Sequence, residues 1–442
     1  MSLLIKNGTL VTMNCTGEVI KADILVQQDR IVEIAPHIDR TAQQTLDATD
    51  MLVIPGLIQS HVHLCQALFR GCADDMELLD WLKLRIWPLE GSHDADSLYY
   101  SALLGCAECL RSGTTAIIDM GTVHHTESIF HAVQRAGIRY LGGKCLMDTG
   151  NQIPATLMDN SDNAINESMD LYQSWNGQSE GRITYALCPR FVLSCSESLL
   201  KQIQQLSAHY QIHIHSHASE NREEVKAVQQ ISGMRNIAYL DKLGMCSDKL
   251  ILAHCIHLDE KEKEILCRSK TNIIHCPTAN LKLASGIARI PELLAGGASI
   301  ALGSDGPPCN NNLDLFQEMR LASLIQKPEH GPTSMPAESV FELATRGGAR
   351  AMGLEKEIGS LERGKKADIV LVKLGGWHTQ PLDAARVYTQ LVYQARSADV
   401  CCTIVDGKVL MLNGHLTTID ERELVTGVKD SFSRLARRSG IN

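Results

Sequence analysis

Four apolar segments of the chain end in histidine, glutamate or aspartate, and these side chains suit a first-row divalent metal. The segments are IPGLIQSHVH (54–63), IHIHSHASE (212–220), LILAHCIH (250–257) and SIALGSDG (299–306). Imidazole nitrogen and carboxylate oxygen both bind such cations. If the preceding runs are parallel strands of one barrel, their ends meet on a single face. The pattern therefore predicts a metal ion that activates water for a hydrolytic reaction.

His61 and His63 are separated by one residue at the end of the first segment. Side chains alternate across a β-strand, so both rings lie on the same side and can chelate one ion. A lone H-x-H pair is weak evidence, because histidines are also ordinary core or surface residues. Its position after a Pro-Gly turn and an apolar run favours the interpretation as two ligands.

The second segment carries His213, His215 and His217 on one strand face. Only the last of them lies near the strand end, so we expect His217 to be a ligand. His215 should support the ligands, and His213 should be a buried core residue. Glu220 follows three residues after His217, and there it can carry protons as general acid and base without binding the ion. The alternative, a carboxylate that stabilises a helix N-terminus, does not explain this spacing.

His254 and Asp305 lie at the ends of the sixth and eighth predicted strands, in the third and fourth segments. Asp305 enters a Gly-Pro-Pro loop, and alone such an aspartate is more typical of a turn. In company with the histidines it is better interpreted as a ligand. Two-metal barrels of this general type need a bridging ligand near the fourth strand, commonly a modified lysine. Here that strand ends with Cys188 and Arg190, so we expect one divalent metal, Zn²⁺ first, with Fe²⁺ or Mn²⁺ as alternatives.

Strand-like runs alternate with amphipathic segments from about residue 52 to about residue 358. The eight runs are 51–63, 115–121, 139–147, 182–190, 211–219, 249–257, 271–278 and 298–305. Ser, Asp or Asn near the start of several intervening segments is typical of helix caps. Eight units of this size predict an α/β fold, a (β/α)₈ TIM barrel.

Both ends of the chain have a β-rich pattern, with turns expected at 28–30 and at Asp406-Gly407. We expect these ends to pair into a small β-sandwich domain beside the barrel. The predicted divisions are residues 1–55 and 359–418 for the β-sandwich, 56–358 for the barrel and 419–442 for a C-terminal helix.

Composition narrows the possible partners. Hydrophobic residues make up 44% and charged residues 21%, which indicates a globular protein with a core. The net charge is −9 and no long basic stretch is present, so we expect no nucleic acid partner. We find neither a signal peptide pattern nor an apolar run of about 18 residues, so we expect no membrane association. Fifteen scattered cysteines are typical of reduced thiols and a cytoplasmic location.

The segments PGLIQSHVH, HASE, AHC and SDG together resemble the amidohydrolase superfamily, in its mononuclear deaminase branch, over nearly the whole chain. The segments LLDWLKLRIWPLE and HCPTANLKLASGIARIPELL are similar to deaminases of methylthioadenosine, S-adenosylhomocysteine and 5′-deoxyadenosine, and to triazine hydrolases. By contrast, CPRFVLSCSESLL and SHASENREEV resemble guanine deaminase.

The resemblance implies a role for each site residue. It makes His61, His63, His217 and Asp305 the metal ligands, Glu220 the proton shuttle and His254 the group that orients the attacking hydroxide. Two further residues are implied to contact the substrate. Glu90 matches a glutamate of the nucleoside deaminases, and Arg190 matches the base-contacting arginine of guanine deaminase. The nucleoside deaminases usually carry a ribose-contacting histidine where Cys188 to Arg190 stand, so this chain departs from them in sugar recognition.

These observations predict an aminohydrolase that removes the exocyclic amine of an adenosine-type nucleoside modified at the 5′ position, releasing ammonia. The alternative within the branch is guanine or another aminated heterocycle, such as a pterin or a triazine. A noncatalytic barrel and a two-metal cyclic amidase remain open as rival classes. The partner would be a small purine or related heterocycle, in purine salvage, and a homo-oligomer is common among relatives.

Overall fold

The computed structural model describes residues 2–150 and 153–441 of the chain. The strands of its barrel are β6 (Leu57–Val62), β7 (Thr114–Asp119), β8 (Arg139–Gly142), β10 (Ile183–Pro189), β11 (His213–Ala218), β12 (Leu250–His254), β13 (Asn272–His275) and β14 (Ser299–Leu302), with a short β9 (Cys145–Leu146) beside β10. They pair in parallel in the order β14-β13-β12-β11-β10-β8-β7-β6. All eight predicted strands are therefore present in the predicted order.

The barrel closes between its first and last strands. The backbone N–H of Asp305 donates to the carbonyl of His61 at 3.0 Å, and that of Ser304 donates to Gln59 Oε1, also at 3.0 Å. Nearly every residue of these strands is buried, because helices cover the outside of a parallel barrel and side chains fill its inside. The strands consequently read as continuous apolar runs. The predicted (β/α)₈ barrel is confirmed.

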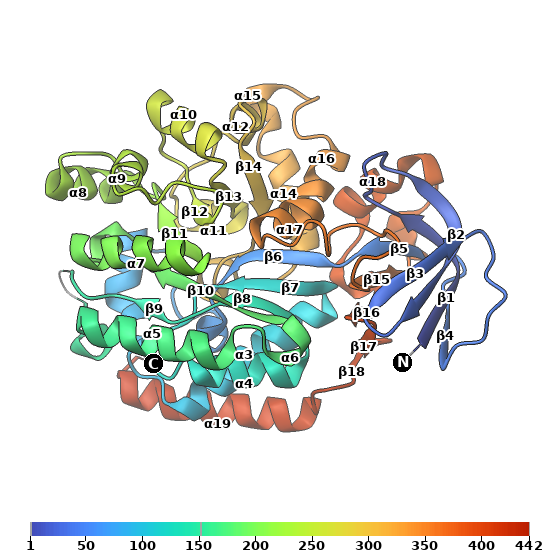
Figure 1. The fold of residues 1–442 in the computed structure, drawn as a ribbon, viewed down its shortest axis with the longest axis horizontal. Coiled ribbons are helices and arrows are strands. Elements are labelled where there is room, and N and C mark those ends of the chain that lie inside the picture. The colour runs from blue at the N-terminus through green and yellow to red at the C-terminus, as the bar shows by residue number, and fades with distance from the viewer. Residues whose placement is uncertain (1, 151–152, 442) are drawn as a thin grey trace.

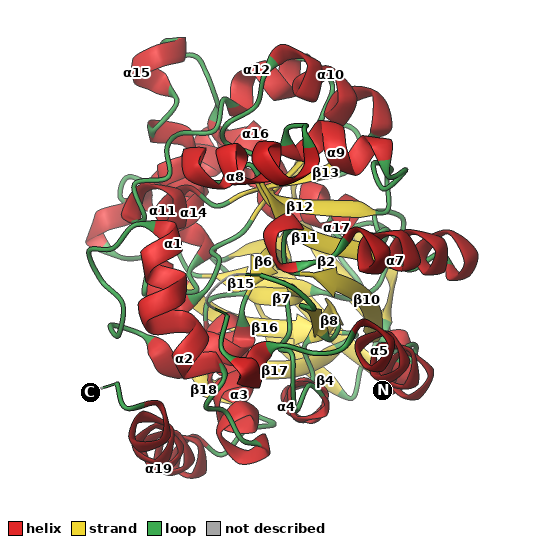
Figure 2. Cartoon of the chain, turned by 90° about the vertical axis from the view of Figure 1, so that its left-hand side faces the viewer, coloured by secondary structure: helices red, strands yellow, loops and turns green. Residues whose placement is uncertain are grey.

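Helices surround the strands, as Figure 2 shows. They are α1 (Leu78–Trp81), α2 (Trp87–Glu90), α3 (Ala95–Arg111), α4 (Glu127–Ala136), α5 (Ser161–Trp175), α6 (Gln178–Gly181), α7 (Glu197–Tyr210), α8 (Arg222–Ser232), α9 (Asn236–Lys242), α10 (Glu260–Ser269), α11 (Pro277–Lys282), α12 (Ile290–Ala295), α13 (Pro307–Asn310), α14 (Leu315–Leu324), α15 (Lys327–His330), α16 (Ala337–Glu342), α17 (Gly348–Ala351), α18 (Val387–Thr389) and α19 (Glu421–Ser439). The side chains of Ser196, Asn221 and Asp259 cap α7, α8 and α10, as their sequence positions predicted.

The two ends of the chain form a second sheet beside the barrel (Figure 1). Its strands are β1 (Ser2–Val11), β2 (Val19–Gln27), β3 (Arg30–Ala35), β4 (Gln44–Asp47), β5 (Leu52–Pro55), β15 (Ile369–Val372), β16 (Val400–Val405), β17 (Lys408–Leu412) and β18 (His415–Leu416). The main order is β18-β17-β16-β15-β5-β1-β2-β3, and β4 pairs with β1. Strand β5 runs antiparallel to β15, which joins the two ends of the chain. The predicted extra domain is present, and its strands form one mixed sheet.

Gly56 alone separates β5 from β6, so the chain passes directly from the terminal sheet into the barrel. A Cβ at this position would lie 1.9 Å from Thr115 Oγ1, which only glycine avoids. The single run predicted for 51–63 is therefore two strands in two sheets. The residue boundaries predicted for the domains stay a prediction.

The last helix, α19, lies against α3 at the outer surface of the barrel. Arg438 Nη1 lies 2.9 Å from Asp94 Oδ2, and Arg434 pairs with Asp96, so ion pairs align the two helices. Among the described residues, no helix combines the length and the apolar character that a membrane crossing requires.

Candidate metal centre and active site

Three imidazole rings and one carboxylate converge at the carboxyl-terminal end of the barrel strands. Nε2 of His61 lies 3.2 Å from Asp305 Oδ1, and Nε2 of His63 lies 3.4 Å from the same oxygen. The Nε2 atoms of His63 and His217 are 3.2 Å apart. One nitrogen from each of the three rings lies within 4.8 Å of the others, and the same holds for His61, His254 and Asp305. The structure thus brings together all four predicted ligands and His254.

The backbone at two of these positions is strained. His254 has a φ of 75° and Asp305 a φ of 66°, in the left-handed region that non-glycine residues rarely adopt. This conformation costs roughly 1 kcal/mol or more per residue and persists only where the surroundings enforce it. His254 is the last residue of β12 and Asp305 lies three residues after the end of β14, so the strain falls where the side chains converge.

Burial sets the charge of the cluster. It lowers the pKa of His61 and, more strongly, the pKa values of His63 and His217, so these rings stay neutral and keep a lone pair. Burial acts to raise the pKa of Asp305, but the neighbouring rings, His61 first, hold that pKa well below its usual range. Three neutral nitrogen donors and one buried anionic oxygen are the donor set of a divalent cation, so these residues fit the predicted metal.

His215 supports the cluster from inside the barrel. Its Nε2 lies 2.8 Å from Nδ1 of His61, and its Nδ1 lies 3.4 Å from the carbonyl oxygen of Asp119. A hydrogen bond to the second nitrogen of a ligating ring fixes the tautomer and the orientation of that ring. His213 lies at the other end of the strand, beside Gly353, and burial lowers its pKa to about 4. Strand alternation predicts both positions, but His213 is only partly buried and so is not the buried core residue that the sequence predicted.

Glu220 faces the cluster from the loop between β11 and α8. Its Oε2 lies 3.4 Å from Nε2 of His254, and its Oε1 accepts a hydrogen bond from Ser285 Oγ at 3.3 Å. Burial raises the pKa of Glu220 to about 7, so its protonated and ionised forms coexist near neutral pH. Nε2 of His254 also lies 3.8 Å from Asp305 Oδ2. One small molecule can therefore contact all three groups.

The two residues predicted to contact substrate contact each other. Arg190 Nη1 lies 2.5 Å from Glu90 Oε2, and Nη2 lies 3.2 Å from Oε1. Both side chains are buried. Glu90 ends a helical stretch from 78 to 90, in which a π-helical turn joins α1 and α2. The predicted substrate contacts thus form one bidentate ion pair at the wall of the site.

Sequence reasoning missed two buried polar residues beside the cluster, Asp119 and Gln66. Asp119 accepts hydrogen bonds from the backbone N–H of Leu64 at 2.8 Å and from the hydroxyl of Tyr140 at 2.9 Å, so it holds the backbone that follows His63. Burial raises the pKa of Asp119 to about 6. Its strand-end position in TAIIDMG matches that of Asp305 in SIALGSDG, a signal that could have found it. No comparable signal marks Gln66.

The cluster borders a narrow cavity with an accessible volume of about 30 Å³. Trp81, Phe191 and Leu283 give it apolar walls, while Glu220 and Arg190 supply polar groups. An apolar pocket with a few converging polar groups is the usual site for a small ring-shaped ligand. The composition of this lining, and not its present volume, therefore suits a flat heterocycle next to the metal centre.

His63, Cys65 and Glu90 also place possible ligand atoms within 4.8 Å of one another. The guanidinium of Arg190 already neutralises Glu90, and burial raises the pKa of the Cys65 thiol well above its usual value. We therefore interpret this group as hydrogen-bonded packing beside the metal centre.

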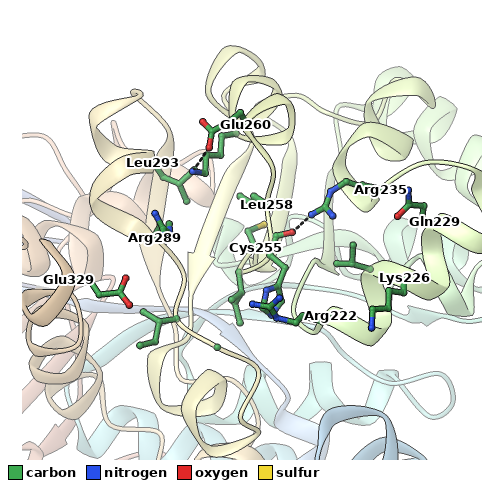
Figure 3. A pocket seen from close by; sticks show the side chains of 16 residues that line it. Arg222, Lys226, Gln229, Arg235, Cys255, Leu258, Glu260, Arg289, Leu293 and Glu329 are labelled. Atoms are coloured by element: carbon green, nitrogen blue, oxygen red, sulfur yellow. Dashed lines mark hydrogen bonds and ion pairs between the residues drawn. The ribbon is translucent and has the colours of Figure 1, made fainter.

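A wider hollow, of about 780 Å³, lies near α8, α10 and α12 (Figure 3). Several of its basic side chains are engaged in ion pairs, including Arg235 with Glu262 at 2.8 Å and Lys263 with Glu292 at 2.7 Å. None of the predicted ligands lines it. We interpret it as a solvated surface hollow.

The family of the protein follows from comparison with known proteins. The model of the amidohydrolase family matches residues 52–410, which include every converging residue. The chain belongs to the amidohydrolase family. The predicted resemblance is thereby confirmed, and the protein is an enzyme that hydrolyses C–N bonds, as the named deaminases among its relatives do.

Two curated amidohydrolases are similar over nearly their full lengths. The 5-methylthioadenosine/S-adenosylhomocysteine deaminase of Moorella thermoacetica is 38% identical over 432 residues, 96% of this chain and 98% of that protein. The 5′-deoxyadenosine deaminase of Methanobrevibacter smithii is 35% identical over 440 residues, 99% of each chain. Among solved structures, an adenosine deaminase from Xanthomonas campestris with bound zinc superposes with a TM-score of 0.92 at 30% identity, covering 98% of each chain.

Proposed function

We propose that this amidohydrolase removes ammonia from an adenosine-type nucleoside modified at the 5′ position, such as 5′-deoxyadenosine, 5′-methylthioadenosine or S-adenosylhomocysteine. The product is the inosine analogue. The observation that carries the proposal is the position of His254, 3.4 Å from Glu220 and 3.8 Å from Asp305, beside three neutral imidazoles. The names of the similar curated deaminases support the class of substrate.

In this proposal His61, His63, His217 and Asp305 hold one divalent ion, with zinc as the first choice. The neutral rings and the ionised carboxylate support this choice, as does the zinc bound in the Xanthomonas structure. Such an ion, when bound, lowers the pKa of a coordinated water to about 7 and so supplies hydroxide at neutral pH.

Asp305, His254 and Glu220 each have a separate role in the proposed proton transfers. Asp305 accepts a proton from the attacking water, and His254, 3.8 Å from Asp305, orients that water toward the ring carbon that bears the amine. Glu220 donates a proton to the neighbouring ring nitrogen, which makes that carbon a better electrophile. The water oxygen adds to the carbon, and Asp305 passes the proton it took from the water to the amine. The C–N bond then breaks and ammonia leaves, while the hydroxyl proton of the adduct returns to Glu220 as the ring carbonyl forms.

Glu220 suits this role because its pKa of about 7 lies near the working pH, where a group can both donate and accept a proton. The apolar walls formed by Trp81 and Phe191 would enclose the purine. Arg190, which also lines the cavity, and its ion-pair partner Glu90 would contact the substrate.

A second candidate is guanine or another aminated heterocycle, such as a pterin or a triazine. The buried guanidinium of Arg190 favours it, because this group lines the cavity and can donate hydrogen bonds to a ring carbonyl. Glu90, which the first candidate needs as a substrate contact, is engaged by Arg190.

Ammonia release from a panel of candidate substrates tests the proposal. We expect turnover of 5′-deoxyadenosine, methylthioadenosine or S-adenosylhomocysteine by the metal-loaded protein, and little turnover of guanine. Turnover of guanine or a pterin alone would establish the second candidate, and inactivity toward every adenosine analogue would refute the first. Purine salvage, a cytoplasmic location, a homo-oligomeric state and the predicted domain boundaries remain proposals alongside it.

A further inference from the structure

Gln66 is a fully buried amide that the proposed mechanism does not use. It lies in the 3₁₀ helix Leu64–Phe69, directly after the ligand strand β6, and none of its side chain is exposed. Its Nε2 donates a hydrogen bond of 2.7 Å to Glu90 Oε1. Within the described part of the chain, its Oε1 has no hydrogen-bond partner. A buried amide oxygen without a donor typically destabilises a fold by about 1–3 kcal/mol, so its retention needs a reason.

Whereas Gln66 needs a donor, the ring of His63 needs a hydrogen-bond acceptor. Its Nε2 faces the cluster, 3.2 Å from His217 and 3.4 Å from Asp305. When Nε2 binds an ion, the neutral ring carries its proton on Nδ1, and that N–H needs an acceptor. Among the residues that the structure describes, Nδ1 of His63 also lacks a hydrogen-bond partner. A donor and an acceptor are thus left unsatisfied three residues apart.

Gly306 shows that these two side chains border the same small space. A Cβ built on Gly306 would lie 2.0 Å from Gln66 Oε1 and 3.5 Å from the Cβ of His63. The φ of Gly306 is −74°, which any residue can adopt, so its backbone does not require glycine. The position instead leaves room for the amide of Gln66 beside the ring of His63.

We propose that Gln66 is a positioning residue that links the metal ligand His63 to the ion pair of Glu90 and Arg190. Its Oε1 accepts the hydrogen bond from Nδ1–H of His63 in the metal-loaded protein, while its Nε2 continues to hold Glu90. The amide then joins the metal centre to the residues that contact substrate. This inference rests on the ligand set in the proposed function.

The affinity of the protein for zinc tests the link without any assay of activity. Metal-free protein is titrated with zinc in competition with a chromophoric chelator. We expect Gln66→Leu to weaken zinc binding by roughly 10- to 100-fold, the usual effect of losing the hydrogen bond that supports a ligating histidine. A zinc affinity of Gln66→Leu within about twofold of the unsubstituted protein would overturn the proposal.

Gln326→Leu is a matched control. Gln326 is also a buried amide, with one donor bond of 2.9 Å to the carbonyl of Ala288 and an Oε1 that has no partner among the described residues. Its replacement should lower the unfolding midpoint and leave zinc affinity unchanged. Equal losses of zinc affinity in both variants would show a general effect of removing a buried amide, which contradicts a specific link.

Two further variants test separately the contact of Gln66 with His63 and its contact with Glu90. Gln66→Glu keeps an oxygen acceptor for His63 and loses the donor to Glu90, so zinc affinity should be retained while KM for the substrate rises. Gly306→Ala should displace the amide and weaken zinc binding in the same direction as Gln66→Leu. The proposed contact would be contradicted if Gln66→Glu lost as much zinc affinity as Gln66→Leu, or if Gly306→Ala lost none.

Protein that binds zinc but deaminates no candidate substrate would refute the proposed function. It would not contradict the proposed hydrogen bond between Gln66 and His63.

Discussion

Arg190 and Glu90, one hundred residues apart in the chain, form a buried bidentate ion pair at the wall of the cavity, with N–O distances of 2.5 and 3.2 Å. The pair joins the end of β10 to the helical stretch that ends at Glu90. Burial removes both charged groups from water, and each compensates the charge of the other. Replacing one of them with a neutral residue would therefore leave the other charge buried and unpaired.

Breaking this pair should destabilise the protein. We expect Glu90→Gln or Arg190→Met alone to lower the free energy of unfolding by about 3–5 kcal/mol, because either leaves a buried charge without its partner. The double variant Glu90→Gln/Arg190→Met should lose less than the sum of the two single losses. Urea unfolding of the metal-free proteins measures all four values, and strictly additive losses would show that the two groups do not interact.

Glu220→Gln should abolish turnover while preserving the metal. The amide cannot donate and recover a proton, so kcat should fall by roughly 10²- to 10⁴-fold. Metal content measured by atomic emission should stay unchanged. Glu223→Gln is the matched control, since Glu223 lies three residues away and is largely exposed, and its side chain forms an ion pair with Lys226 at the surface. Full activity of Glu220→Gln would remove Glu220 from the mechanism.

Removal of the metal should stop the reaction reversibly. Protein treated with a chelator should lose ammonia release, and about one equivalent of zinc per chain should restore it, because the four predicted ligands converge on one point. Two equivalents per chain would instead favour a two-metal cyclic amidase.

Substitution of single histidines should sort ligands from core residues. His217→Asn should reduce metal content strongly, because His217 supplies one of only four predicted ligands. His213→Asn, on the same strand face but away from the cluster, should retain the metal. Equal metal loss from both variants would mean that folding of the strand, and not coordination, governs metal content.

The stability of the metal-free protein should depend on pH through buried imidazoles. The pKa of His213 is about 4 in the folded protein against 6.5 in the unfolded chain. Below pH 6.5 the imidazole of His213 is protonated in the unfolded chain but not in the folded protein. The contribution of His213 to the free energy of unfolding therefore decreases as the pH falls from 6.5 to about 4, and it is constant above pH 6.5. Compared with His213→Gln, the unsubstituted protein should lose about 1–2 kcal/mol more between pH 7.5 and pH 5 in urea unfolding. Parallel pH profiles would refute the burial of this ring.

The barrel could be predicted because its strands are short apolar runs at regular spacing, and parallel strands covered on both sides give that pattern. The division at Gly56 could not, because one uninterrupted apolar run supplies both β5 and β6. Only the approach of Thr115, distant in sequence, explains why the glycine stands there.

The converging residues could be predicted because strand ends of a barrel share one face, which places His61, His217 and Asp305 together without knowledge of the loops. The pairing of Arg190 with Glu90 could not, since it depends on the path of the 78–90 helical stretch across the mouth of the barrel. Local sequence carries no measure of that path.

The terminal sheet has a consequence for biosynthesis. Strand β5, which leads directly into β6, pairs with β15, and β15 begins more than three hundred residues later. The ribosome must therefore synthesise the whole barrel before β5 and β15 can pair, and until then the edge of β5 stays unpaired. Nascent chains stalled before β15 should be the most prone to aggregate and to need chaperone protection.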